Sequence, residues 1–451
     1  MNRALDLSYL RGKPVPVMGL GLSGLATAQA LQASGVEVWA WDDSPESVAK
    51  ARAAGAHVVD LTIADLSQCE ILVLSPGIPH SFPEPHPIVL RAREAGLKLV
   101  GDVELLARAA PQARKVGITG TNGKSTTTAL IGHVLQKAGI EVAIGGNLGI
   151  PVLTFPTLSA NGVYVLEMSS YQLELLDTLV FDVGVHLNVT PDHLDRHGGM
   201  PGYVAAKARM FVGQKAGQTA IVGVDDLYSA DMARNLGKQK LVRLSVKHAE
   251  PDGITVVDGI IVENGRRVAD VSDIPTLPGA HNWQNAGAAY AACRALGIDE
   301  ATVLAHMRSF PGLPHRQQLV ATINGVRYVN DSKATNADAA AKALGCYEQI
   351  RWIAGGRPKI GGLTGLDRYM PRVAKAYLIG EAQADFARWL EGRAQFSLCG
   401  HLERAVADAA RDAQPGDVVL LAPACASFDQ YRSFEVRGQH FMELVRALEA
   451  A

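Results

Sequence analysis

The chain has few cysteines and no long apolar run, and both shortages restrict its class. Its five cysteines, at positions 69, 293, 346, 399 and 425 of 451 residues, form no Cys-x-x-Cys pair and no metal-binding spacing. This odd, scattered set fits reduced thiols in the cytosol better than a disulfide framework. No apolar segment approaches about 18 residues, and the opening residues, MNRALDLSYLRGKP, lack the apolar core of a signal peptide. We therefore expect a cytoplasmic protein without a membrane span.

An excess of charge is also missing. Lysine and arginine number 43, aspartate and glutamate 45, and the formal net charge is -2. This balance gives no reason to expect a nucleic acid or an anionic membrane as partner, although it leaves room for a local phosphate pocket. The contents of 48% hydrophobic and 20% charged residues are typical of globular proteins. A chain of this length suggests two to four domains.

Strand-like and helical stretches alternate along the chain, which predicts an α/β protein with mainly parallel sheets. We expect three domains, at 1–108, 109–309 and 310–451. The last boundary falls at Pro-Gly-Leu-Pro (residues 311–314), because proline and glycine favour a linker. Within the second domain, residues 240–275 are rich in valine, isoleucine and glycine and are expected to form β-hairpins.

The segment KVGITGTNGKSTTT, residues 115–128, is a candidate phosphate loop. An apolar strand leads into glycines, and a helix is expected to start near Lys124. Such glycines let backbone N–H groups approach phosphate oxygens, while the lysine reaches the terminal phosphates and the hydroxyl of Ser125 binds Mg²⁺. The spacing departs from the general P-loop, which needs glycine where this chain has Ile118. A glycine-rich turn without a nucleotide is the alternative.

A second glycine run, GLGLSG at residues 19–24, follows a strand and precedes a helical pattern, with Asp42 and Asp43 about 20 residues on. Alone, this is a Rossmann fingerprint. It indicates that a diphosphate could bind, but not that a nicotinamide does. Tight packing of strand and helix without any ligand is the other interpretation.

Three polar side chains between the phosphate loop and residue 210 are candidates for metal chemistry. Glu167 ends the predicted strand 163–167, His193 lies in NVTPDHLD, and Lys207 lies in the helical stretch 203–211. A carboxylate and an imidazole at strand ends near a phosphate loop could hold Mg²⁺. Exposed polar groups and an exposed helix lysine are the alternatives.

Seven motifs, in order along the whole chain, resemble the Mur ligases of peptidoglycan synthesis. They are GITGTNGKST, EMSSYQLE, HLNVTPDHLDRH, GAHNWQN, GLPHR, NDSKATN and PACASFDQYRSFEVRG. The resemblance implies a Rossmann-like N-terminal domain for UDP, a central P-loop ATPase domain and a C-terminal Rossmann-like domain that brings the amino acid. It is strongest to members that add D-glutamate to UDP-N-acetylmuramoyl-L-alanine through an acyl phosphate, a cytoplasmic step of cell-wall synthesis. Such a protein is expected to act as a monomer.

The resemblance also implies roles for individual residues. Catalytic roles fall on Lys124, His193 and Lys207. ATP is expected at Gly120, Thr121, Asn122, Gly123, Lys124, Ser125, Thr126, Thr127, Asn282, Asn285, Arg316, Asp331 and Lys333. Two Mg²⁺ ions are expected at Ser125, Glu167, His193 and Lys207, the last as a carbamylated lysine. Carbamylation requires a neutral amine, so the surroundings must lower the pKa of this lysine.

The remaining implied positions contact the other two substrates. The UDP-muramoyl substrate is expected at Leu22, Ser23, Asp43, Ser44, Gly77, Asn147 and His193. Glutamate is expected at Thr335, Lys359, Ser427 and Phe434. One departure concerns Lys359, because Gly-Gly-Arg-Pro-Lys at 355–359 replaces the Gly-Gly-Asp-Gly-Lys type of loop, and its proline stiffens the backbone.

Other functions remain possible at this level. Within the same class, the chain could be another Mur ligase or a relative of folylpolyglutamate synthase. From other classes, it could be a nicotinamide oxidoreductase that uses residues 19–24, or a non-catalytic sensor of UDP-sugars. A sensor has no need for Lys124, Glu167, His193 and Lys207 together. The D configuration of the glutamate is inferred from the family alone.

Overall fold

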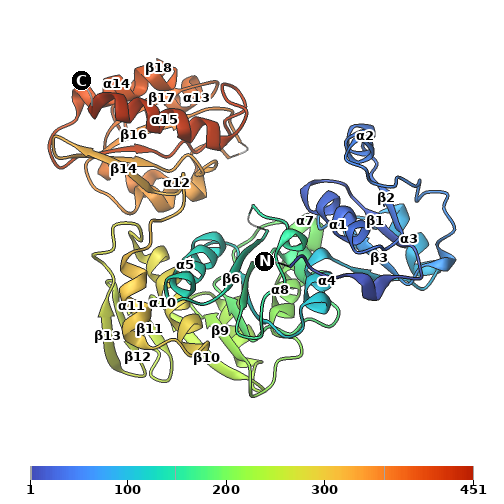
Figure 1. Ribbon diagram of the computed structural model, residues 1–451. Helices are drawn as coiled ribbons and strands as arrows, with labels where there is room; N and C mark the ends of the chain where they lie inside the picture. Colours follow the sequence, from blue (N-terminus) through green and yellow to red (C-terminus); the bar gives the residue numbers. More distant parts are fainter. Residues whose placement is uncertain (1–2, 148, 360, 450–451) are drawn as a thin grey trace. The chain divides into compact units, whose positions relative to one another are not determined.

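The computed structural model describes residues 3–147, 149–359 and 361–449, and they contain three sheets flanked by helices (Figure 1). The chain divides into two compact units. The first comprises the residues up to Val271 together with Asn282–Ser309, and the second comprises Ser272–His281 and the residues from Phe310 onward. The predicted α/β class is confirmed. Within the described part of the chain, no helix is both long and apolar enough to cross a membrane.

The N-terminal sheet has four parallel strands in the order β2-β1-β3-β4. The residues of β1 and β3 are all buried, as expected of central strands covered on both faces. The elements of this part are β1 (Val15–Met18), α1 (Leu22–Ala33), β2 (Val38–Trp41), α2 (Pro45–Ala53), β3 (Ile71–Leu74), α3 (Pro87–Glu94), β4 (Lys98–Val100) and α4 (Asp102–Ala109).

The central sheet has nine strands in the order β13-β12-β11-β10-β9-β8-β5-β7-β6. The seven from β6 to β11 are parallel, and β12 and β13 are antiparallel additions at one edge. The elements are β5 (Arg114–Thr119), α5 (Lys124–Lys137), β6 (Val142–Gly146), β7 (Val163–Glu167), α6 (Ser170–Glu174), β8 (Val183–His186), α7 (Leu194–His197), α8 (Met200–Ala208), β9 (Thr219–Gly223), α9 (Leu227–Arg234), β10 (Lys240–Ser245), β11 (Ile254–Val257), β12 (Ile260–Glu263), β13 (Arg266–Asp270), α10 (Ala280–Ala295) and α11 (Glu300–Arg308).

The prediction of β-hairpins in residues 240–275 is only partly correct. Strands β11, β12 and β13 form a meander, but β10 pairs in parallel with both β9 and β11. Strand β10 thus belongs to the parallel part of the sheet. A run of valines and isoleucines does not distinguish these two pairings, because both bury apolar side chains.

The C-terminal sheet has six strands in the order β14-β15-β19-β16-β17-β18, with β14 antiparallel at its edge. Its elements are β14 (Gln318–Ile323), β15 (Val326–Asn330), α12 (Ala337–Leu344), β16 (Ile350–Gly355), β17 (Val373–Ile379), α13 (Gln383–Leu390), β18 (Phe396–Gly400), α14 (Leu402–Asp412), β19 (Val418–Leu421) and α15 (Phe434–Glu449). Trp352 on β16 is fully buried and donates its indole N–H to the carbonyl oxygen of Ala422 (2.8 Å).

The segment Ser272–His281 belongs to the second unit although it lies far upstream in the sequence. Thr276 Oγ1 donates to the carbonyl oxygen of Phe310 (2.8 Å), and the imidazole of His281 lies 3.3 Å from the side-chain amide nitrogen of Gln317. The second unit is therefore built from two separate stretches of chain. The predicted domain limits of 1–108, 109–309 and 310–451 stay predictions.

Asp102, the first residue of α4, is a buried acid that lines a small hollow with Ser23, Thr27 and Ser75. Burial raises its pKa from 3.8 to about 6, against the opposing effect of the Val103 N–H. The native state therefore keeps a proton that the unfolded state has lost between these pH values, so this group lowers stability as pH rises from about 4 to about 6.

We expect Asp102→Asn to stabilise the protein at pH 8, by about 3 kcal/mol at most, and to have little effect near pH 4. Midpoints of urea unfolding at pH 4.5 and 8 check this result. Glu94→Gln, which alters an exposed acid of α3, is the control and should leave the difference between the two midpoints unchanged. Equal destabilisation by Asp102→Asn at both pH values would contradict the prediction.

Candidate functional site

The phosphate loop lies at the carboxyl end of β5, which occupies the interior of the central sheet. Gly120 and Gly123 have φ angles of 149° and 88°, values that favour glycine. Helix α5 begins at Lys124 as predicted, so its first N–H groups point toward the loop. Lys124 Nζ donates to the carbonyl oxygens of Gly120 (2.8 Å) and Thr121 (2.9 Å), which holds the ammonium group over the loop.

The position of Gly123 leaves no room for a side chain. A Cβ atom there would lie 2.3 Å from Asn285 Oδ1 and 2.9 Å from Leu187 Cδ1. We expect Gly123→Ala to destabilise the protein by about 1–3 kcal/mol, because backbone strain adds to the clash, and to weaken the ATP binding predicted for this loop about tenfold or more. Thermal unfolding and calorimetric titration with ATP measure both effects. Gly217→Ala, where a Cβ meets nothing within 4 Å, should change neither.

Side chains from the segment after β8 and from α8 contact the phosphate loop. Asn188 Oδ1 accepts from the backbone N–H of Asn122 (2.9 Å), and Thr121 Oγ1 lies 3.2 Å from the hydroxyl of Tyr203. Asn188 and Tyr203 were not among the predicted site residues. Asn188 follows β8 directly, and polar residues at the carboxyl ends of parallel strands were a signal that could have identified it.

Two residues predicted to contact ATP, Asn282 and Asn285, are close to one another on α10. Asn285 Nδ2 donates to Asn282 Oδ1 (3.0 Å), and Thr127 Oγ1 of α5 donates to Asn285 Oδ1 (3.2 Å). Both asparagines are buried. Ser125 is also buried, whereas Thr126 is partly exposed. The first turn of α5 thus carries one buried and one partly exposed hydroxyl-bearing residue.

Lys207 is unusual in its burial, because a lysine side chain is rarely buried. Only 1% of it is exposed, and Nζ donates to the carbonyl oxygen of Gly120 (2.9 Å). Nζ also lies 4.5 Å from the centre of the Tyr203 ring. Burial, followed by the nearby charge of Lys124, holds the pKa of Lys207 well below its usual range, and Asp192 opposes this shift. The amine is thus placed beside the phosphate loop in surroundings that favour its neutral form.

Glu167 ends β7 beside the loop and is only 3% exposed. Its Oε1 accepts from Asn147 Nδ2 (2.9 Å), while Oε2 is buried without a hydrogen-bond partner among the described residues. A buried carboxylate oxygen without a donor is costly unless a cation binds it. This carboxylate therefore fits the chemistry of a Mg²⁺ ligand. Mg²⁺ typically uses one or two carboxylates together with substrate phosphates, so few protein ligands are needed.

His193 adopts a left-handed backbone conformation, with φ of 52°, and its side chain is half exposed. Its ring centre lies 5.2 Å from that of Tyr171, and Nε2 lies 3.4 Å from Asp192 Oδ2. Among the residues that the structure covers, no three His, Cys, Asp or Glu side chains gather as metal ligands would. The metal-binding role given to His193 stays a prediction.

The N-terminal glycine run forms a tight turn between β1 and α1. A Cβ at Gly24 would lie 1.7 Å from the carbonyl oxygen of Gly19, so only glycine fits there. Asp42, at the end of β2, accepts from the backbone N–H groups of Leu20 (2.6 Å) and Ser44 (2.8 Å). The predicted UDP positions around this turn are exposed, apart from the partly buried Ser23; they are Leu22, Asp43, Ser44 and Gly77.

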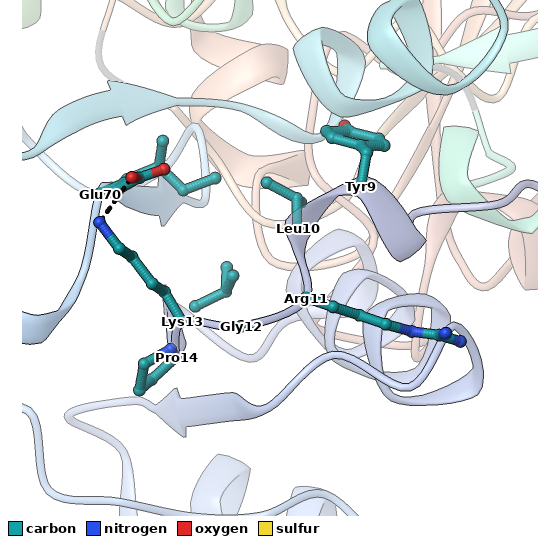
Figure 2. A pocket seen from close by; sticks show the side chains of 9 residues that line it. Tyr9, Leu10, Arg11, Gly12, Lys13, Pro14 and Glu70 are labelled. Carbon is teal, nitrogen blue, oxygen red and sulfur yellow. Dashed lines mark hydrogen bonds and ion pairs between the residues drawn. The ribbon is translucent and has the colours of Figure 1, made fainter.

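A hollow of about 230 Å³ lies elsewhere on this domain, where β1 and β3 begin at Val15 and Ile71 (Figure 2). The ion pair between Lys13 Nζ and Glu70 (2.6 Å) borders it, and more than half of each of the two side chains is exposed. Ligands of open α/β sheets bind at the opposite, carboxyl ends of the strands. This hollow is therefore separate from the predicted UDP positions.

In the second unit, most of the residues predicted to contact ATP and glutamate lie in the segments that follow β15, β16 and β19, whereas Arg316 precedes β14 and Phe434 begins α15. Burial raises the pKa of Asp331 to about 7, and its Oδ1 accepts from the backbone N–H of Gln317 (3.2 Å). Lys333 Nζ lies 3.8 Å from the centre of the Phe434 ring. Ser427 is 2% exposed, and Thr335 and Arg316 are partly buried, whereas Lys359 is exposed.

The comparisons with known proteins agree over the whole chain. Residues 13–101 match the profile "Mur ligase MurD-like, N-terminal domain", residues 118–293 match "Mur ligase middle domain", and residues 315–425 match "Mur ligase, glutamate ligase domain". The UDP-N-acetylmuramoylalanine–D-glutamate ligase of Rhodospirillum rubrum is 52% identical, over 99% of this chain and 97% of the relative. The protein of the same name from Paramagnetospirillum magneticum is 49% identical, over 99% of both chains.

Solved structures show the same fold at low sequence identity. The UDP-N-acetylmuramate-alanine ligase of Thermotoga maritima superposes with a TM-score of 0.58 and 18% identity, over 96% of this chain and 99% of the other. A pseudomurein peptide ligase from Methanothermus fervidus gives a TM-score of 0.57 and 16% identity, over 97% of this chain and 100% of the other. These structures support the three-domain architecture.

Proposed function

This chain belongs to the Mur ligase family, and we propose that it is an ATP-dependent ligase that joins D-glutamate to UDP-N-acetylmuramoyl-L-alanine. The relatives that match it over nearly their whole length carry the name of that reaction. The observation that carries the proposal most directly is the buried Lys207 amine against the Gly120 carbonyl, because a nucleotide-binding loop alone has no use for it.

The reaction requires two anions to meet, since the alanyl carboxylate must attack the terminal phosphate of ATP. Lys124, held over the loop by two carbonyl oxygens, offsets negative charge on the transferred phosphate. Mg²⁺ supplies further charge neutralisation when it is bound. Ser125 and the Oε2 atom of Glu167 are its protein ligands in this proposal. Asn147 orients the side-chain carboxylate of Glu167 by donating a hydrogen bond to its Oε1 atom.

Lys207 is proposed to carry a carbamate. A neutral amine adds to CO₂ through a new N–C bond and loses one proton to solvent, which gives an N-carboxylate, and burial together with Lys124 favours that neutral amine. The adduct replaces a cation that repels Mg²⁺ with a carboxylate that binds it. His193 is proposed to contact the muramoyl substrate and the second ion. Its exposed ring is a candidate base for the incoming amine.

The acyl phosphate then reacts with glutamate bound to the C-terminal domain. Lys359 is proposed to pair with a carboxylate of the glutamate and Ser427 to hydrogen-bond the same group, with Thr335 and Phe434 beside them. Arg316, Asp331 and Lys333 complete the ATP site. The turn at residues 19–24 receives the UDP diphosphate in this proposal, with Leu22, Ser23, Asp43, Ser44 and Gly77 around it. We also propose that the enzyme is a cytoplasmic monomer with the domain limits given above.

One assay tests the proposal. The protein is incubated with ATP, Mg²⁺ and UDP-N-acetylmuramoyl-L-alanine, and D-glutamate, L-glutamate, meso-diaminopimelate or lysine is added in turn. Phosphate release with D-glutamate alone is the expected result. Release with a diamino acid would assign the chain to another member of the family. Tight NAD binding without phosphate release would favour an oxidoreductase.

A further inference from the structure

Arg437 is a buried arginine on α15 that the proposed reaction does not use. It is 1% exposed, and its guanidinium binds backbone carbonyls and a hydroxyl instead of a carboxylate. Nε donates to Ser332 Oγ (3.0 Å), and Nη2 donates to the carbonyl oxygens of Ser332 (2.9 Å) and Cys425 (3.2 Å). Nη1 donates to the carbonyl oxygen of Ala426 (3.4 Å). One planar group thus joins Ser332, in the loop after β15, to Cys425 and Ala426, in the loop after β19.

A third loop lies close to this guanidinium. A Cβ at Gly356 would lie 3.1 Å from Arg437 Nη1, so the backbone at Gly356, three residues before Lys359, is near the group. Arg357 and Ala426 exchange two backbone hydrogen bonds, of 2.9 and 3.1 Å, which tie this loop to the one that carries Ser427. The three loops therefore share a single support.

The four positions assigned to glutamate belong to two loops that Arg437 binds, to a third loop beside it, and to α15, the helix that carries it. Thr335 follows the Ser332 loop, Lys359 follows Gly356, and Ser427 follows Ala426. Phe434 starts α15 one turn before Arg437, and its carbonyl oxygen accepts from Ser332 Oγ (2.8 Å). The guanidinium thus lies beside the segments that carry all four positions, and it binds Ser332, Cys425 and Ala426 within them.

The charge of this group has no close partner within the described residues, because no carboxylate lies within ion-pair distance of it. Asp429 acts on it from farther away, and one oxygen of that carboxylate accepts from the Glu381 N–H (3.1 Å). Burial lowers the pKa of Arg437 to about 10, so it stays protonated at neutral pH. A buried cation that binds only neutral groups leaves a positive potential, which favours anions nearby.

We propose that Arg437 is the positioning residue of the amino-acid site: it fixes the three loops relative to one another and favours an amino acid with two carboxylates. This inference rests on the proposed function, since it assigns a part of the same site. A lysine cannot replace the group, because its compact ammonium cannot reach several carbonyls in one plane as the guanidinium fork does.

Kinetics of Arg437→Lys and Arg437→Met test the proposal in the full-length enzyme. We expect the KM for D-glutamate to rise roughly tenfold to a hundredfold in Arg437→Met, the range for lost hydrogen bonds to a charged group. The KM for the UDP-muramoyl substrate should stay within about twofold, and the KM for ATP should rise less than that for D-glutamate, because the Ser332 loop also carries Asp331 and Lys333. Arg437→Lys keeps the charge but not the fork and should be intermediate. Arg446→Met removes an exposed arginine of the same helix and should match the wild type.

Two further measurements keep the test decisive. The preference for D-glutamate over D-glutamine should fall in Arg437→Met, because the neutral substrate gains nothing from the positive potential. Ser332→Ala removes one acceptor and should raise the KM for D-glutamate several-fold even if Arg437→Met does not fold. An unchanged KM for D-glutamate in both Arg437→Lys and Ser332→Ala overturns the proposal. A wild-type enzyme that releases no phosphate with D-glutamate overturns the proposed function instead.

Discussion

Lys207→Ala is expected to lower kcat for ligation by roughly 10²–10³-fold or more, with KM for ATP changed far less, because it removes a charge-stabilising group that acts on the phosphoryl transfer. Short carboxylic acids such as acetate should restore part of the rate, since a free carboxylate can occupy the space of the proposed carbamate. Steady-state phosphate release with and without acetate measures both effects.

Two controls accompany this prediction. Lys215→Ala alters an exposed lysine shortly after α8 and should leave the rate unchanged. A carbonyl signal from ¹³CO₂ bound to the wild type, absent in Lys207→Ala, would identify the adduct independently of turnover. Full activity of Lys207→Ala in buffer without carboxylic acids would reject the role of this lysine.

Lys124→Met is expected to abolish ligation, with kcat reduced about a thousandfold, because the developing charge on the transferred phosphate loses its nearest cation. A second effect follows from the repulsion between the charges of the two lysines. The charge of Lys124 contributes to the lowered pKa of Lys207, so its removal should raise that pKa and make the neutral amine scarcer.

The effect of Lys124 on the pKa of Lys207 can be measured separately from the rate of ligation. Binding of ¹³CO₂ followed by NMR between pH 6.5 and 9 should show, in Lys124→Met, a carbamate signal that requires a higher pH than in the wild type. The loop contacts of Lys124 make a stability change possible, so thermal unfolding serves as the control. An unshifted pH profile would mean that burial alone sets the pKa of Lys207.

Much of the fold follows from the sequence because buried parallel strands are short apolar runs that end in glycine or polar residues. The strand before Gly120, the strand ending at Glu167 and the helix at Lys124 are where the pattern places them. The helical stretch expected at 203–211 instead begins at Met200 and changes to a 3-10 turn at Arg209. Helix ends depend on capping and tertiary contacts, which periodicity does not report.

The site was less accessible to sequence reasoning. Motifs identify which residues matter but not what holds them, so the Asn147 contact of Glu167 and the burial of Lys207 required coordinates. Arg437 lies within the motif PACASFDQYRSFEVRG, but the sequence does not show that it is buried, because a buried arginine and a surface arginine look alike in a helix. Its partner Ser332 is 105 positions away in the sequence and its partner Cys425 is 12 positions away, and only the folded chain brings them together.

The segment Ser272–His281 has a consequence for how this protein can be divided and made. Because Thr276 and His281 contact residues of the second unit, that unit contains chain from both sides of α10 and α11. A fragment that begins at Phe310 leaves out part of its own structure, so a simple cut there does not give an independent domain. During synthesis, Ser272–His281 leaves the ribosome before the residues from Phe310 onward, so it can form its contacts with them only after they have been made.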